Sequence, residues 1–185
     1  MSLRIVGVCG SLRKESYNRK LLKLILVKLA TLGAGAEEVS IGDIPLYNGD
    51  IEEKGIPKAV QTFKEELKSA DGLVFVTPEY NWSIPGVFKN AIDWASRPSS
   101  DIPKIFHGQV VLQAGSSDGA RATVRAQQHL LSVCQTLKLI VLPQQILIAN
   151  ENEAFDNQGN LARESDLKQL EKVAEKFIEM IRKLK

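Results

Sequence analysis

The sequence has few of the residues that form disulfides or metal sites. Its 185 residues include two cysteines, Cys9 and Cys134, and two histidines, His107 and His129. The cysteines lie in apolar stretches without Cys-x-x-Cys spacing, so we expect two buried thiols in a reducing compartment. No group of His, Cys, Asp and Glu has the spacing of metal ligands, and we expect no metal.

Long apolar runs and a strong net charge are also absent. No run approaches the roughly 18 apolar residues that a membrane span needs, and the opening stretch MSLRIVGVCG does not have the form of a signal peptide. The net charge is +2, from 24 basic and 22 acidic side chains, with no basic stripe. We therefore expect a cytoplasmic protein with no membrane partner and no nucleic-acid partner.

Two common nucleotide-binding motifs are missing as well. The absence of Gly-Lys-Ser/Thr argues against a nucleoside triphosphate site. The absence of G-x-G-x-x-G, and of an acidic residue at the end of the second expected strand, argues against a Rossmann dinucleotide site.

What is present is a regular alternation of apolar strands and amphipathic helices. The expected strands cover 3–9, 36–41, 72–77, 109–115 and 139–148, the last interrupted by Pro143. The expected helices cover 17–32, 60–67, 85–95, 121–137 and 167–181, and the polar stretch 150–160 is expected to be a surface loop.

Continuous apolar strands that alternate with helices predict a parallel sheet buried on both faces. We expect one domain over 1–185, with five strands in the order 2-1-3-4-5 of a three-layer flavodoxin-like fold. Ligands of such sheets bind beyond the carboxyl ends of the strands, where the strand order reverses. Three loops should meet there: GSLRKESYN (10–18), PEYNWSIPG (78–86) and GSSDG (115–119).

The first loop has the composition of a phosphate site at a helix N-terminus. Ser11, Ser16 and Asn18 can donate hydrogen bonds, Arg13 can pair with a phosphate through two N–H groups, and Gly10 permits the sharp turn. The alternative is a Ser/Asn-capped helix start beside an exposed arginine. With triphosphates and dinucleotides disfavoured, a monophosphate is the ligand that remains.

The second loop is stiffened by two prolines and contains Glu79, Tyr80, Asn81 and Trp82. Aromatic and amide groups on a rigid loop suit a flat heteroaromatic ring. The alternative is a hairpin-like turn whose aromatic side chains cover the core. The helix that follows, 85–95, has apolar residues on more than one face, which predicts self-association.

The third loop matches G-x-S-x-G around Ser117, and therefore raises the alternative of a serine hydrolase. That mechanism needs an acid and then a histidine later in the chain, but His107 precedes the serine and His129 lies far along the helix that leaves the loop. We expect both histidines to be solvated or capping. We expect the backbone amides of 116–119 to form a polar cradle instead.

Taken together, these loops resemble the NAD(P)H-dependent FMN reductase family, in particular its quinone and chromate reductase branch. The similarity lies in GSLRKESYN, IPLYNGD, PEYNWSIPGVFKNAIDWASRP and AQQHL. It implies bound FMN with its phosphate in the first loop, its ribityl chain and isoalloxazine along the second, and Ser117 beside the ring. The implied cofactor-binding residues are Ser11, Leu12, Arg13, Ser16, Tyr17, Asn18, Pro78, Glu79, Tyr80, Asn81, Ser116 and Ser117.

The resemblance also implies an activity. NADPH or NADH passes hydride to FMN, which then reduces a quinone, a flavin, chromate or an azo compound in a ping-pong cycle, with no catalytic side chain required. A homodimer or homotetramer is expected, partly through 85–95. Two features depart from the family pattern, Trp82 and the run Ala122-Thr123-Val124, and both concern the acceptor or the subunit interface. The alternatives are a flavodoxin-like electron carrier without NAD(P)H activity and a flavin-free binding module.

Overall fold

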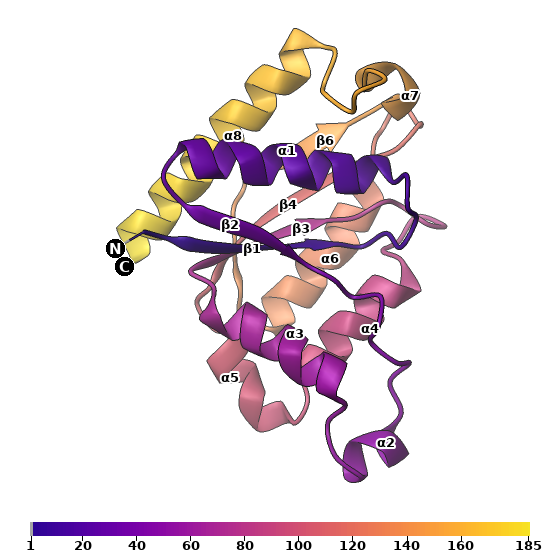
Figure 1. The fold of residues 1–185 in the computed structure, drawn as a ribbon, viewed down its shortest axis with the longest axis vertical. Coiled ribbons are helices and arrows are strands. Elements are labelled where there is room, and N and C mark those ends of the chain that lie inside the picture. The colour runs from indigo at the N-terminus through magenta and orange to yellow at the C-terminus, as the bar shows by residue number, and fades with distance from the viewer. Residues whose placement is uncertain (1) are drawn as a thin grey trace.

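A twisted parallel sheet runs through the molecule in the computed structural model, which describes residues 2–185 (Figure 1). Its strands are β1 Arg4–Cys9, β2 Gly35–Val39, β3 Gly72–Val76, β4 Val110–Ser116, β5 Ile140–Val141 and β6 Ile146–Ile148. The order is β2-β1-β3-β4-β5, and β6 also pairs with β4. Every pair is parallel, so the expected fold class and strand order are confirmed.

The fifth expected strand is divided in two at Pro143. β5 pairs with the beginning of β4 and β6 with its end. Proline has no N–H to donate to the ladder, so pairing stops after Leu142, whose N–H donates to the Val111 carbonyl at 2.9 Å. The side chains of Gln145 and Gln113 continue the connection with a 3.0 Å hydrogen bond.

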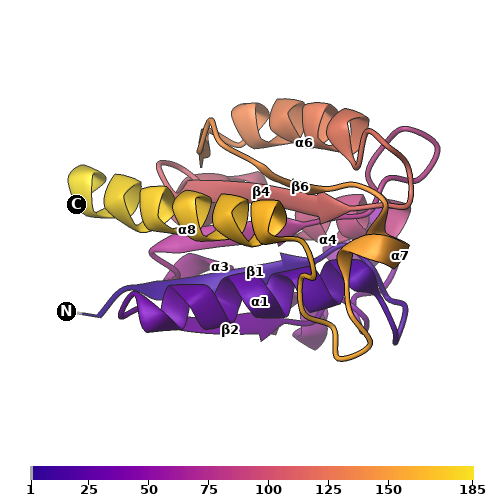
Figure 2. The same ribbon diagram turned by 90° about the horizontal axis from the view of Figure 1, so that it is seen from above.

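Helices cover both faces of the sheet, which forms the middle of three layers (Figures 1 and 2). The longer helices are α1 Tyr17–Thr31, α3 Lys58–Ser69, α4 Gly86–Ala95, α6 Val124–Thr136 and α8 Glu164–Leu184; the short ones are α2 Gly49–Glu53, η1 Ser99–Asp101, α5 Ile102–Ile105 and α7 Glu151–Ala154. One apolar cluster joins α1 and α8 to the sheet, and a second joins α3, α4, α5 and α6 to its other face. Successive strand residues alternate between them, as Val110 and Val111 do.

Two expectations about helix positions are wrong. The helix expected over 121–137 begins at Val124, because Ala122 has a φ of +48° and 121–123 form a turn. The expected surface loop 150–160 contains α7. Ala154, the last residue of α7, and Phe155, which follows it, are both buried. Their apolar side chains fold this polar segment back onto the α1 side of the core.

The apolar excess of α4 is buried within the chain itself. Phe88, Ala91, Ile92, Trp94 and Ala95 are all buried. The face that we expected to be free for self-association holds Trp94, whose Nε1–H donates to the Pro45 carbonyl at 2.8 Å. The Tyr47 ring lies edge-on to this indole, with 5.0 Å between ring centroids. Contacts within the chain therefore account for the burial of the apolar side chains of α4, and a second subunit is not needed to cover them.

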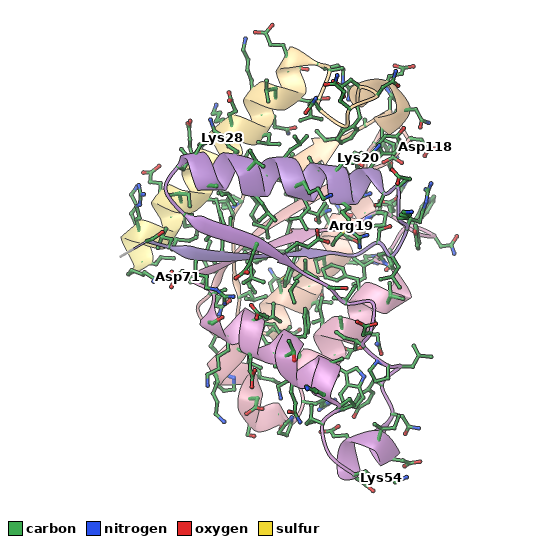
Figure 3. The ribbon with its side chains drawn as sticks, viewed as in Figure 1. Arg19, Lys20, Lys28, Lys54, Asp71 and Asp118 are labelled. Atoms are coloured by element: carbon green, nitrogen blue, oxygen red, sulfur yellow. The ribbon has the colours of Figure 1, made fainter. Side chains whose placement is uncertain are left out.

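The carboxyl ends of the strands lie at one end of the sheet. The N and C termini of the chain both lie at the opposite end (Figures 1 and 2). Asp71, which precedes β3, forms an ion pair with Lys185, whereas Asp118 follows β4 at the far end of the molecule (Figure 3). Within residues 2–185, no helix combines the length and apolarity of a membrane span.

Candidate functional site

A pocket of about 210 Å³ opens at the carboxyl edge of the sheet, between the three loops named above and α7. It is lined by Ser11, Arg13, Ser16, Tyr17, Asn18, Pro78, Glu79, Tyr80, Ser116, Ser117, Asp118 and Glu151. The structure thus brings together all of the implied cofactor-binding residues except Leu12 and Asn81. Asp118 and Glu151 are additions that the sequence analysis did not assign to the cofactor.

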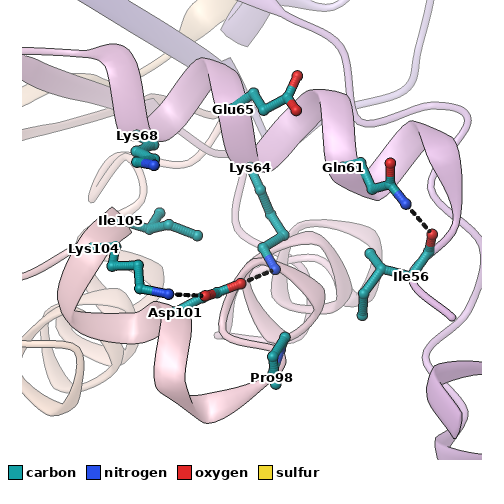
Figure 4. A pocket seen from close by; sticks show the side chains of 9 residues that line it. All are labelled: Ile56, Gln61, Lys64, Glu65, Lys68, Pro98, Asp101, Lys104 and Ile105. Atoms are coloured by element: carbon teal, nitrogen blue, oxygen red, sulfur yellow. Dashed lines mark hydrogen bonds and ion pairs between the residues drawn. The ribbon is translucent and has the colours of Figure 1, made fainter.

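A larger hollow of about 330 Å³ lies elsewhere, between α3 and α5 (Figure 4). Two of its lysines are paired with one carboxylate: Asp101 accepts hydrogen bonds from Lys64 at 2.7 Å and Lys104 at 2.9 Å. These bonds lower the pKa of Asp101 to about 2. Because the smaller pocket stands where the strand order reverses, and its polar groups converge, we place the candidate site there.

The first loop presents hydrogen-bond donors to this pocket. Ser16 caps α1, and its Oγ accepts from the Arg19 N–H at 3.3 Å. Ser11 and Ser16 are both buried, and Arg13 is exposed at the pocket wall. Within residues 2–185, the N–H groups of Tyr17 and Asn18 have no acceptor, as is usual in a first helical turn. Such groups and the helix dipole favour an anion here.

Asn18 has a structural function in addition to its place in the pocket. Its amide donates to the Ser116 carbonyl and accepts from the Ser116 N–H, both at 2.9 Å. The side chain is buried and joins the start of α1 to the end of β4. Its oxygen and one of its N–H groups are therefore already engaged, in contrast to the free donor that we expected.

Arg19 supports the first loop from behind, and sequence reasoning missed it. Its guanidinium pairs with Glu38 on β2 at 3.1 Å and donates to the Ser11 carbonyl at 3.2 Å. Arg19 lies in the first turns of α1 (Figure 3). A signal was available in the sequence. The helix α1 connects β1 to the edge strand β2, so an arginine near the start of α1 can reach an acidic side chain on β2.

The second loop is a two-residue turn. Tyr80 and Ser83 exchange backbone hydrogen bonds of 2.9 and 3.0 Å, and Asn81 and Trp82 between them have φ values of +49° and +66°. The hairpin alternative is thus right about the turn and wrong about the aromatic side chains, since Tyr80 and Trp82 are exposed. A left-handed conformation is costly for tryptophan and is held here by the surrounding contacts.

Three contacts fix this turn to α6. The Glu79 carboxylate accepts from the backbone N–H groups of Arg125 and Ala126, each at 3.0 Å, and so caps a helix whose own N-cap residue, Thr123, makes no capping bond to the helix backbone. The Arg125 guanidinium lies 3.8 Å from the centre of the Trp82 ring. His129 Nδ1 lies 2.9 Å from Ser83 Oγ.

These contacts bear on the expectations for His129 and Trp82. His129 is exposed to solvent, as expected, and its ring also supports the second loop through Ser83. Trp82 and Arg125 also line an open hollow of about 490 Å³ that adjoins the pocket and shares Glu79, Ser117 and Asp118 with it. The departures at Trp82 and Ala122 therefore lie beside the candidate site.

The third loop satisfies most of its own polar groups. Ser117 Oγ donates to the Ala122 carbonyl at 2.9 Å, so it is not paired with a base as a hydrolase serine would be. The N–H groups of Ser116, Ser117 and Gly119 bond to Asn18, Ile148 and Ser117 Oγ. The expected cradle of free backbone amides is therefore largely absent from this loop.

Glu151, at the start of α7, lines the pocket together with the residues of the three loops. Ser116 Oγ donates to Glu151 Oε2 at 2.6 Å, and the Glu151 N–H donates to the Ser117 carbonyl at 3.1 Å. Burial raises the pKa of this carboxyl, and the nearby charge of Asp118 adds to the rise. The sequence analysis missed it because only the loops after the first, third and fourth strands were considered, although every parallel strand ends at this rim.

The chemistry of the pocket fits a flavin mononucleotide. Free helical N–H groups, two buried serines and one arginine suit its phosphate, while the exposed Tyr80 and the adjoining open hollow leave room for a flat ring. Within residues 2–185, no three or more His, Cys, Asp or Glu side chains are grouped to hold a metal ion. Both cysteines are buried, and burial raises the pKa of Cys134 to about 12.

Comparison with known proteins agrees with this geometry. Residues 3–153 match the family model described as NADPH-dependent FMN reductase. A 2-hydroxy-1,4-benzoquinone reductase of Burkholderia sp. is 38% identical over 98% of both chains. An NAD(P)H-dependent FMN reductase of Pseudomonas aeruginosa is 42% identical over 86% of this chain and 84% of its own.

Among solved structures, the flavoenzyme NAD(P)H:(acceptor) oxidoreductase FerB of Paracoccus denitrificans superposes with a TM-score of 0.86, at 32% identity over 98% of both chains. The expected enzyme class is confirmed, NADPH and FMN are the cofactors that the family description names, and the electron-carrier alternative is not retained. The chain belongs to the family of NADPH-dependent FMN reductases.

Proposed function

We propose that this chain binds FMN in the pocket at the carboxyl edge of the sheet and passes reducing equivalents from NADPH or NADH to a quinone or a free flavin. The observation that carries the proposal is the start of α1. Its free N–H groups, the buried Ser11 and Ser16 and the guanidinium of Arg13 converge on one pocket at the point where the strand order reverses.

The chain's own residues bind and orient, and the cofactor supplies the redox chemistry. When bound, FMN provides the atom that accepts hydride from the nicotinamide and returns it to the acceptor. Arg13, Ser11 and Ser16 would hold the phosphate end. Pro78, Tyr80, Ser116 and Ser117, which line the rest of the pocket, would orient the ring.

The two substrates are proposed to use one binding face in turn, which gives ping-pong kinetics. The hollow beside Trp82 and Arg125 is open, and it adjoins the pocket at Glu79, Ser117 and Asp118. A quinone is the favoured acceptor because relatives at 36–38% identity are quinone reductases. Chromate and azo compounds are further acceptors that an open, partly cationic face would admit.

Reconstitution and anaerobic reduction test the proposal. Purified protein loaded with FMN is expected to be yellow, to bleach with NADPH or NADH without oxygen, and to recover its colour when a benzoquinone is added. Double-reciprocal plots at several quinone concentrations should be parallel. A protein that binds no FMN, or that binds FMN without oxidising either nicotinamide, would contradict it.

A homodimer or homotetramer in the cytoplasm completes the proposal. The support for self-association comes from exposed apolar side chains that follow the ends of β2 and β3, such as Leu46, Tyr80 and Trp82. Trp94 on α4 gives no such support, because it is buried within the chain. Light scattering after size-exclusion chromatography tests the assembly; a monomer at micromolar concentration would refute it.

A further inference from the structure

Glu151 places a carboxyl group in a pocket that fits a phosphate. Its side chain is held by the 2.6 Å bond from Ser116 Oγ, and its backbone by the 3.1 Å bond to the Ser117 carbonyl. Glu151 is thus held both at its side chain and at its backbone, so its carboxyl group cannot turn away from the pocket without loss of the Ser116 bond. Apolar packing of Ala154 and Phe155 holds the short helix in place.

The pocket has little positive charge to offset this carboxyl. The other charged or titratable side chains that line it are Arg13, Tyr17, Glu79, Tyr80 and Asp118. One guanidinium therefore faces three carboxyl groups, before the phosphate adds nearly two more negative charges at neutral pH. Glu79 is compensated by the amides of α6, whereas Asp118 and Arg13 line the pocket near enough to Glu151 for their charges to act on its carboxyl group.

We propose that Glu151 takes up a proton from water when FMN binds, and that the neutral carboxyl is what allows the phosphate to lie beside it. This inference rests on the proposed function. The proton is released again when FMN leaves, so the exchange is balanced. The neutral carboxyl becomes a donor as well as an acceptor, and can bond both Ser116 and a phosphate oxygen.

The pKa of Glu151 in the free protein is already displaced in the direction that the inference requires. Burial and Asp118 raise it, while the Ser116 bond and the charge of Arg13 partly offset the rise. A bound phosphate raises the pKa further, because a like charge disfavours the carboxylate. FMN affinity must then fall as the pH rises from the pKa of the free protein to that of the complex.

Isothermal titration calorimetry of FMN and riboflavin tests the inference. Titrations between about pH 6.5 and pH 8.5, in buffers of different ionisation enthalpy, count the protons taken up on binding. The proteins are the wild type, Glu151→Gln and Glu153→Gln. Glu153 is an exposed carboxylate on the same short helix, so its variant loses an equal charge outside the pocket. FMN loses its own second phosphate proton near pH ~6, and this contribution is the same in all three proteins.

Glu151→Gln is expected to bind FMN about tenfold more tightly or better near the upper end of this range, with a gain that shrinks as the pH falls. It should take up fewer protons than the wild type, and its riboflavin affinity should be unchanged. Glu153→Gln should behave as the wild type. Equal FMN affinity and equal proton uptake in wild type and Glu151→Gln, or weaker binding by Glu151→Gln, would overturn the inference.

The wild type alone decides the matter if Glu151→Gln does not fold. Its proton uptake must then be larger for FMN than for riboflavin at about pH 8, where free FMN is already a dianion; equal uptake overturns the inference. Failure of the proposed function is a different result, because no protein in the series would then bind FMN at any pH.

Discussion

The side-chain amide of Asn18 exchanges two hydrogen bonds of 2.9 Å with the main chain of Ser116, 98 residues further along the chain. This contact joins the first loop to the third at the base of the candidate site. Both groups of Ser116 are buried, so nothing else can replace the bonds.

Asn18→Ala should therefore destabilise the protein. Removing the amide leaves a buried N–H and a buried C=O of Ser116 unpaired, which costs about 2–4 kcal/mol in the free energy of unfolding. Urea unfolding followed by circular dichroism measures the loss. Asn152→Ala, at an exposed position, is the matched control and should change stability little; a similar loss in both variants would argue against the bonds.

Arg13→Gln should weaken FMN binding and leave riboflavin binding alone. A charge-assisted bond to the phosphate contributes enough that its loss lowers FMN affinity roughly 10- to 100-fold. Lys14→Gln removes the same charge from the neighbouring residue, which does not line the pocket. Fluorescence titrations with both flavins measure the four affinities. Equal losses in the two variants would indicate a general effect of charge.

Glu79→Ala should loosen the second loop. The α6 amides of Arg125 and Ala126 lose their cap, at a cost of about 1–2 kcal/mol, and Glu79→Gln should lose less because it keeps an oxygen acceptor. Thermal unfolding gives the stability. Acrylamide quenching reports the exposed Trp82, since the other tryptophan, Trp94, is buried. Unchanged stability in Glu79→Ala would refute the capping role.

Ala122→Gly should stabilise the protein by about 0.5–1 kcal/mol. Ala122 has a φ of +48°, which is unfavourable for alanine and free for glycine, and the gain exceeds the added entropy of the unfolded chain. Ala120→Gly is the control, because Ala120 lies two residues away without a positive φ. Chemical unfolding of both variants should separate them; a gain for Ala120→Gly alone would contradict the explanation.

Acid should remove the stability that Asp101 contributes. Hydrogen bonds from Lys64 and Lys104 lower its pKa from 3.8 to about 2, so the contribution is complete above the ordinary pKa and is lost as the pH falls toward 2. The wild type should lose about 1 kcal/mol more than Asp101→Asn between pH 4 and pH 2. Parallel curves of unfolding free energy against pH would show that the ion pairs contribute nothing.

Much of the fold could be predicted, because apolar periodicity determines which face of each element is buried. β3 is buried along its whole length, and its continuous apolar run GLVFV is visible in the sequence. α7 was missed because its four residues, three of them polar, are too few to show a helical period. Only the burial of Phe155 in the folded protein shows where this segment packs. The start of α6 was placed too early because a positive φ at an alanine has no sequence signature.

The site was predictable as a set of loops but not as a set of contacts. Ser11, Arg13 and Ser16 lie where the loop motif suggested. Propensity cannot show that Asn18 and Glu79 are engaged with Ser116 and α6, because these partners are distant in sequence. Trp94 was misread for the same reason: an apolar side chain on a second helix face predicts burial, but not whether its own chain or another covers it.

The position of the chain ends, on the edge of the sheet away from the pocket, has a practical consequence. Lys185 pairs with Asp71 at that edge, so a peptide tag or a surface linker joined to residue 185 would extend away from the mouth that flavin and nicotinamide must reach. Protein immobilised on an electrode through this end should therefore keep its access to dissolved substrates.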